Sequence, residues 1–331
     1  MLTLPLDTER LLAIFNRALR GALHGTRLAL PAAALALAPG CGPCPPVDQI
    51  YLLRDPDAQT QALIDACRDP SHPTCTPLCA SVSGRPAEQF AHCELHHDRE
   101  GYAEVHVGWE VACPGGRRPR RLAFGGAGRA SSAAGRWFAG LCQLEAASVP
   151  AFQMLGTELA RAEAPASLLR AAAVAAGDER RHTRMAARLA RRFGAEPGRP
   201  DVGPAVRRDL GALCEENAIE GCVRETYGAA LAFVQAATTR DPVVRAAMGR
   251  IAVDETRHAV LAMAVDRWGA GRLGARARAR TIQARAAAVA ELRAGVRHDG
   301  DWSPELGATV GLPPPPVALA LVDQLERALW A

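Results

Sequence analysis

The chain has 331 residues, of which 49% are hydrophobic and 22% are charged, so it is long enough for about two domains and wholesale disorder is excluded. All 39 basic residues are arginine, they are spread along the chain, and the formal net charge is only +4. Because no concentrated basic stretch is present, we expect no nucleic-acid partner.

The first 40 residues have the pattern of an export signal. Several arginines precede the apolar run 28–39, which is too short to span a bilayer but has the length of the hydrophobic part of a signal peptide. The run ends at Cys41 in a sequence that resembles a bacterial lipoprotein box, which implies a lipid anchor on that cysteine. We therefore expect residues 1–40 to be a leader and the protein to reside in the cell envelope. The alternative is an N-terminal amphipathic helix in a cytoplasmic protein.

Residues 41–125 are expected to form a small cysteine-rich domain of loops and strands. Six cysteines lie between Cys44 and Cys113, and in an oxidising compartment this even number predicts up to three disulfides with the pairing left open. The run 92–97, His-Cys-Glu-Leu-His-His, has metal-binding residue types but lacks paired zinc-ligand spacing. We interpret it as a solvated strand or loop beside a strand-like stretch at 102–113.

Near residue 125 the composition changes to long alanine- and leucine-rich stretches with a period of 3.6 residues. Prolines and glycines divide this region into four main predicted helices, at 136–162, 166–194, 205–237 and 242–269. Residues 270–331 are expected to form a C-terminal helical extension, with helices at 272–296 and 316–330.

Two pentapeptides in the second and fourth of these helices match at four of five positions. They are Asp178-Glu179-Arg180-Arg181-His182 and Asp254-Glu255-Thr256-Arg257-His258. In each, Glu and His lie three residues apart, so both side chains leave the helix on one face and can bind one metal ion. A single such pair is weak evidence, and its repetition is much stronger.

A glutamate precedes each pentapeptide at nearly the same distance. Glu145 lies 34 residues before Glu179, and Glu220 lies 35 residues before Glu255. Helical hairpins that turn near residues 162 and 238 bring the members of each pair to one height. A glutamate from each of two helices and a Glu-x-x-His from each of two others is the pattern of a di-iron or di-manganese carboxylate bundle. The expected metal ligands are Glu145, Glu179, His182, Glu220, Glu255 and His258.

With this set of motifs, residues 136–269 resemble the ferritin-like di-iron carboxylate superfamily, and the repeated Asp-Glu-x-Arg-His looks most like its monooxygenase and oxidase branches. The resemblance implies a mainly α fold: a ferritin-like four-helix bundle with extra C-terminal helices, preceded here by the small cysteine-rich domain. It also implies that Asp178 and Asp254 orient ligand histidines, since a ligating imidazole needs its other N–H held. The alternative for both is an ordinary solvated helix charge.

Three further side chains lie near Glu220 along the third predicted helix. Glu216, one turn earlier, is a candidate seventh metal ligand or a surface carboxylate. Arg224 stands where hydrocarbon monooxygenases often carry a threonine, and Tyr227 lies two turns after Glu220 on the same face. Arg224 and Tyr227 are therefore candidate catalytic residues, and the alternative for Tyr227 is a wall of the pocket or core.

We expect a non-haem di-iron oxidase or oxygenase that uses dioxygen to oxidise a small organic substrate held beside Phe152 and Tyr227. The sequence identifies neither the substrate nor the electron donor. Oxygen-rich ligation with two imidazoles favours two iron ions, or manganese, over zinc. One alternative is an iron-binding or ferroxidase-type protein of the cell envelope without an organic substrate. Another is a structural protein in which the metal braces the bundle.

The ferritin-like order also predicts the path of the link between the second and third helices. Residues 195–204 include three prolines and extend over at most about 33 to 36 Å. We expect this segment to run straight along the bundle, which makes the second and third helices parallel.

Overall fold

The computed structural model describes residues 13–17, 47–54, 56–68, 75–83, 90–97, 101–109, 117–119, 122–123, 131–202, 207–297 and 302–330. The chain divides into two compact units, and each is treated by itself: residues 42–111 with 124–127, and the remainder of the chain. Most of the expected leader lies outside the described residues, as do the expected lipid-attachment residue Cys41 and two of the cysteines, Cys44 and Cys113.

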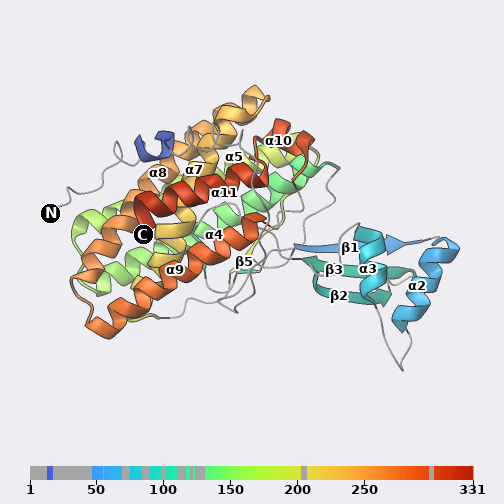
Figure 1. Ribbon diagram of the computed structural model, residues 1–331, viewed down its shortest axis with the longest axis horizontal. Helices are drawn as coiled ribbons and strands as arrows, with labels where there is room; N and C mark the ends of the chain where they lie inside the picture. The colour runs from blue at the N-terminus through green and yellow to red at the C-terminus, as the bar shows by residue number, and fades with distance from the viewer. Residues whose placement is uncertain are drawn as a thin grey trace. The chain divides into compact units, whose positions relative to one another are not determined.

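The smaller unit is a three-stranded antiparallel sheet with two helices (Figure 1). Its strands are β1 (Val47–Leu53), β2 (Phe90–His97) and β3 (Ala103–Trp109), in the order β1-β3-β2, and its helices are α2 (Ala58–Arg68) and α3 (Thr76–Ser83). The sequence correctly predicted a strand at β3, and of the strand or loop expected at 92–97 the structure shows the strand, as part of β2. It did not predict α2 and α3, which are short and lie in a stretch rich in cysteine and proline.

The core of this unit forms between one face of the sheet and the two helices. Ile64 of α2 and Leu78 of α3 pack with Val105 and Val107 of β3. Two disulfides tie the same elements together, Cys67–Cys75 between the helices and Cys79–Cys93 between α3 and β2. The prediction of disulfides in this region is thus confirmed for two pairs.

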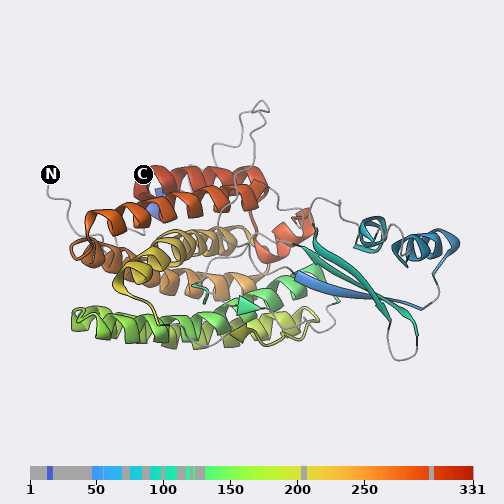
Figure 2. The same ribbon diagram turned by 90° about the horizontal axis from the view of Figure 1, so that it is seen from below.

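The larger unit is helical, and its main helices agree closely with the four expected ones. They are α4 (Ala133–Arg161), α5 (Ala166–Arg192), a third helix in three parts, and α8 (Pro242–Ala270). The third helix consists of α6 (Leu210–Glu216), the π-helix η2 (Asn217–Glu225) and α7 (Thr226–Thr238). Helix α4 packs along α5, and α7 packs along α8 (Figure 2).

Ion pairs at the helix ends fix the direction of the third helix. Arg208, just before α6, binds Glu158 near the end of α4, with Nη2 and Oε2 2.6 Å apart. Because α5 begins where α4 ends, this pair places the start of α6 beside the start of α5. At the C-terminal end of α5, Arg192 binds Asp241, the residue that follows α7 and caps α8. Helices α5 and α6–α7 therefore run in the same direction, which confirms the prediction of parallel second and third helices.

The link between these helices is described only in part. Residues 201–202 form the short strand β5, which pairs with β4 (Leu122–Ala123), and residues 203–206 lie outside the described residues. The prediction that the link is straight therefore falls partly on residues that the structure does not describe.

The C-terminal extension continues the helical unit. It contains α9 (Ala275–Arg297), α10 (Pro304–Val310), α11 (Pro315–Leu325) and a final π-helix η3 (Glu326–Trp330). Helix α9 packs on α6 and η2, and α11 packs on α9 and α7. Among the described helices none is by itself long and apolar enough to cross a membrane, and only α10 and α11–η3 taken together, bent by 54°, meet that requirement.

Candidate metal centre

Two groups of buried side chains in the helical unit bring together atoms that are able to bind metal. In each group the carboxylate oxygens and imidazole nitrogens all lie within 4.8 Å of one another. One group is Glu145, Glu179, His182 and Glu255, and the other is Glu179, Glu225, Glu255 and His258. Glu179 and Glu255 belong to both groups, so the two sets of donors adjoin and share two carboxylates.

The imidazoles face these carboxylates through Nδ1. Nδ1 of His182 lies 3.4 Å from Oε2 of Glu145 and 3.1 Å from Oε1 of Glu255. Nδ1 of His258 lies 3.1 Å from Oε1 of Glu179 and 3.5 Å from Oε2 of Glu225. The two ring centroids are 6.0 Å apart. Each histidine therefore directs one ring nitrogen into its own group of carboxylates.

Most of these donor atoms lack hydrogen-bond partners among the described residues. Both side-chain oxygens of Glu179, Glu225 and Glu255 are buried without such a partner, and so is Nδ1 of each histidine. A buried carboxylate without a compensating charge costs several kcal/mol. The arrangement is explained if cations complete it, because oxygen atoms and imidazole nitrogens are ordinary metal ligands. The donor set therefore fits a buried metal centre.

Without a cation, the centre holds protons. Burial and the nearby Glu179 raise the pKa of Glu145 well above its usual range, and burial and Glu255 do the same for the pKa of Glu225. Burial also opposes ionisation of Glu255, but the charge of His258 and the close approach of both imidazoles outweigh it and lower the Glu255 pKa. For His182 and His258 the surrounding carboxylates outweigh burial and raise the pKa. Cations binding here must displace these protons.

Two aspartates outside the donor groups contact the other ring nitrogen of each imidazole. Nε2 of His182 lies 3.1 Å from Oδ2 of Asp254, and Nε2 of His258 lies 3.3 Å from Oδ2 of Asp178. Arg181 and Arg257 each bind both aspartates. The structure thus places both aspartates where the resemblance implied. The sequence did not reveal that the pairing is crossed, with each aspartate supporting the histidine of the other pentapeptide.

The structure does not bring Glu220 or Glu216 into either group, which corrects the expectation that Glu220 is a metal ligand. Glu220 accepts a hydrogen bond from the backbone N–H of Arg118 at 3.2 Å and forms an ion pair with Arg224. Glu216 lies 3.3 Å from Arg208 and 3.7 Å from Arg117. Both carboxylates are therefore engaged by arginines.

Glu225 takes the place that the sequence assigned to Glu220, and the π-helix η2 explains the difference. Equal spacing of glutamates before the two pentapeptides selected Glu220, on the assumption of a regular α-helix. Hydrogen bonds of the i→i+5 type in Asn217–Glu225 widen the turn and change which side chains face the helix partners. The periodicity of the sequence does not reveal the π-helix. One available signal was that Glu220 and Arg224 have the i, i+4 spacing of an ordinary helical ion pair, which engages Glu220.

The two candidate catalytic residues, Arg224 and Tyr227, also lie outside both donor groups. Arg224 binds Glu220 and, at 3.2 Å, Glu291 of α9. Tyr227 is 4% exposed and packs in an apolar core formed with α9 and α11, which includes Val289 and Leu321. The structure therefore provides no argument for catalysis by Arg224 or Tyr227.

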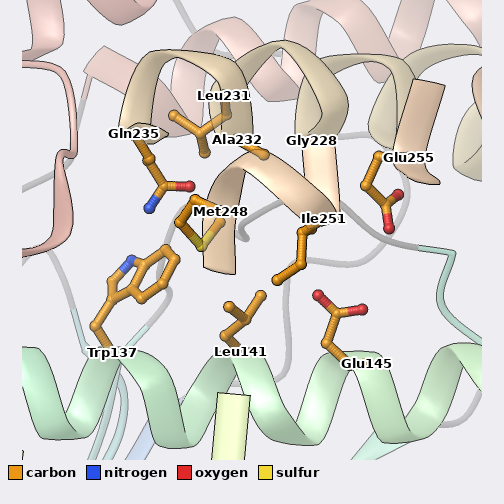
Figure 3. A pocket seen from close by; sticks show the side chains of 10 residues that line it. All are labelled: Trp137, Leu141, Glu145, Gly228, Leu231, Ala232, Gln235, Met248, Ile251 and Glu255. Carbon is orange, nitrogen blue, oxygen red and sulfur yellow. The ribbon is translucent and has the colours of Figure 1, made fainter. Parts of the chain in front are cut away.

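A small pocket adjoins the centre on the side of Glu145 and Glu255 (Figure 3). The two carboxylates lie at one end, and Trp137 and Gln235 lie at the other (Figure 3). The walls between them come from α4, α7 and α8, and consist of Leu141, Gly228, Leu231, Ala232, Met248 and Ile251. The free space is about 20 Å³, which is room for about one water molecule.

The pocket is not where the sequence placed the substrate. Neither Phe152 nor Tyr227 is among its lining residues. Phe152 lies between His258, at 4.9 Å between ring centroids, and the guanidinium of Arg117, at 5.4 Å from its ring centroid. Phe152 therefore packs against a candidate ligand.

Comparison of the chain with models of protein families, with curated proteins and with solved structures finds no match.

Proposed function

We propose that the protein is a non-haem di-iron oxidase or oxygenase in which α4, α5, α6–α7 and α8 form a ferritin-like four-helix bundle. The observation that carries this proposal is the pair of adjoining donor groups, in which Glu179 and Glu255 belong to both. Four ionised glutamates with two neutral histidines carry four negative charges, which two divalent cations neutralise. A site with six protein side chains, rich in oxygen and with two imidazoles, suits iron or manganese.

Each metal ion has its own histidine in this scheme. Glu145 and His182 would hold one iron ion and Glu225 and His258 would hold the other, and Glu179 and Glu255, which belong to both donor groups, would be available to either ion. Iron held here would supply redox chemistry with dioxygen. Asp254 and Asp178 accept the Nε2–H of the histidines, which keeps each Nδ1 free of a proton and directed at the metal.

The pocket would give a small molecule a place beside the centre, next to Glu145 and Glu255. Leu141, Leu231 and Ile251 present apolar walls next to the carboxylates of Glu145 and Glu255 (Figure 3). Apolar walls favour dioxygen and apolar substrates over water, and limit loss of reducing equivalents to solvent. An organic substrate larger than this space requires side chains such as Met248 to move.

The small free space favours a second candidate function, oxidation of ferrous iron by dioxygen without an organic substrate. About 20 Å³ beside the centre accommodates a water-sized molecule and does not require an organic one. The two candidates share the metal centre and differ only in what is oxidised.

Loading the metal-free protein with ferrous iron under anaerobic conditions tests the proposal. We expect about two iron ions per chain by the donor count, and on exposure to air an iron-dependent absorption band together with uptake of oxygen. Purified protein that retains only trace iron after this treatment would falsify the proposal. Continuous turnover of added ferrous iron favours the second candidate, whereas an organic product formed in proportion to the oxygen consumed favours the first.

A further inference from the structure

The smaller unit repeats a short motif on two neighbouring strands. Glu94 and His96 of β2 are separated by one residue, and so are Glu104 and His106 of β3. Side chains at i and i+2 on a strand point to the same side of the sheet. Each strand therefore presents a glutamate and a histidine on one face.

The strand register brings the two motifs together. In the antiparallel pairing of β2 with β3, Glu94 lies opposite His106 and His96 lies opposite Glu104. Directly opposite residues have Cβ atoms about 4.5 to 5.5 Å apart. The four side chains thus form a quartet in which each imidazole has a carboxylate beside it on its own strand and another across the ladder.

The observed contacts agree with this arrangement. Nε2 of His96 lies 2.9 Å from Oε2 of Glu94, and Nε2 of His106 lies 3.4 Å from Oε2 of Glu104. The two imidazole centroids are 4.4 Å apart. The side chain of His96 is 49% exposed and that of His106 is 29% exposed. The two imidazoles therefore lie side by side and are accessible to an incoming ion, although the donor atoms of the four side chains do not all lie within 4.8 Å of one another as they stand.

The backbone beneath the quartet is held in place. The residues that alternate with it, Leu95 and Val105, face the core of the unit, and the Cys79–Cys93 disulfide joins β2 to α3 next to Glu94. Only the side chains need to reorient for the two imidazoles to bind one ion. Sites built on strands with a fixed backbone lose less conformational entropy when they bind a ligand.

We propose that Glu94, His96, Glu104 and His106 form a second metal site, which binds a divalent transition metal of the zinc, copper and nickel class. Two imidazoles select ions of this class, and two carboxylates neutralise their charge. The sequence run 92–97 lacked paired ligand spacing because the second pair comes from the neighbouring strand. This site is independent of the proposed di-iron function, since all four residues lie in the smaller unit.

Copper titration of the full-length, iron-loaded protein tests this site, because Cu²⁺ binds a given nitrogen and oxygen site more tightly than other divalent ions of the first transition row. We expect the wild-type protein to bind one more Cu²⁺ ion than the double variant His96→Asn/His106→Asn. Its electron paramagnetic resonance spectrum is expected to show hyperfine coupling to imidazole nitrogen that the double variant lacks. A parallel titration with Zn²⁺ is expected to show the same difference in stoichiometry.

His97→Asn is the matched control, because His97 is in the same strand but is not part of the quartet and lies next to Arg68. This variant is expected to bind copper as the wild type does. Equal copper stoichiometry and affinity in the wild type and the double variant would overturn the proposal, as would an equal loss in His97→Asn. Iron content and circular dichroism of all three proteins verify that the variants fold and that the helical unit is unchanged.

Discussion

Nε2 of His182 on α5 donates a hydrogen bond to Oδ2 of Asp254 on α8, over a distance of 3.1 Å. The aspartate belongs to one pentapeptide and the histidine to the other. Because His258 makes the reciprocal contact with Asp178, the two pentapeptides hold each other's imidazoles in one tautomer. The crossed pairing joins α5 to α8 through the candidate metal centre.

Replacing Asp254 with Asn is expected to weaken metal binding by about 10- to 100-fold, the usual effect of losing a carboxylate that supports a ligating histidine. The amide no longer stabilises the required tautomer of His182. Competition with a chelator of known affinity measures the change. Asp178→Asn is expected to behave alike through His258. Asp266→Asn, which removes a partly buried ion pair with Arg285 of α9 and belongs to neither donor group, is the control and should retain full affinity.

Two variants test which glutamate of the third helix binds metal. Glu225→Gln removes the carboxylate that the structure places in a donor group, and Glu220→Gln removes the one expected from the sequence. Glu225→Gln is expected to lose one of two bound iron ions, because an uncharged amide replaces one of the four donor carboxylates. Glu220→Gln is expected to retain both, since Glu220 binds Arg118 and Arg224 instead. Iron analysis after anaerobic loading is the measurement. The opposite pattern would show that a regular α-helix, rather than η2, carries the ligand.

Local periodicity was sufficient to predict most of the larger unit. Apolar spacing and the breaks at Pro165 and Pro242 predicted the bounds of α4, α5 and α8 and the end of α7 within a few residues. The short helices α2 and α3 were missed, since two or three turns in a stretch rich in cysteine and proline give little periodic signal.

At the centre, the sequence predicted the donors that depend on local spacing. Glu179 with His182 and Glu255 with His258 follow from helix geometry, and Glu145 follows from the hairpin. Glu225 was missed because a π-helix leaves no mark on the pattern of apolar residues. The Glu94, His96, Glu104 and His106 quartet was missed for another reason, because strand register depends on pairing between distant parts of the chain.

Filling the pocket beside Glu145 is expected to slow the reaction with dioxygen. Ala232 is 2% exposed and lines a free space of about 20 Å³, which the three added carbons of Ala232→Leu would occupy. Oxygen uptake per bound iron should fall while iron content stays unchanged, since Ala232 is not a donor. The matched control is Ala229→Leu. Ala229 lies on α7 as Ala232 does, but it belongs to a different core, which includes Val289 of α9. Equal rates in the two variants would show that the pocket is not the route to the centre.

Glu291 of α9 is expected to make the helical unit less stable as the pH rises. Arg224 donates to its Oε2 at 3.2 Å and is shared with Glu220. Burial outweighs the nearby charge of Arg118 and raises the pKa of Glu291 to about 7 from its ordinary value of 4.5. Between these two values the folded chain binds more protons than the unfolded chain, so the free energy of unfolding falls with rising pH. This contribution is fully present below about pH 4.5 and lost above about pH 7.

Glu291→Gln tests this dependence, because the amide has the same shape and still accepts from Arg224, but cannot ionise. The measurement is the thermal midpoint of the iron-loaded protein at about pH 5 and about pH 8, for wild type and variant. We expect the midpoint to fall further in the wild type than in Glu291→Gln, and the variant to be the more stable of the two at the higher pH. If the two proteins lose equal stability over this range, Glu291 is not ionising from a buried state, and the contact with Arg224 outweighs its burial.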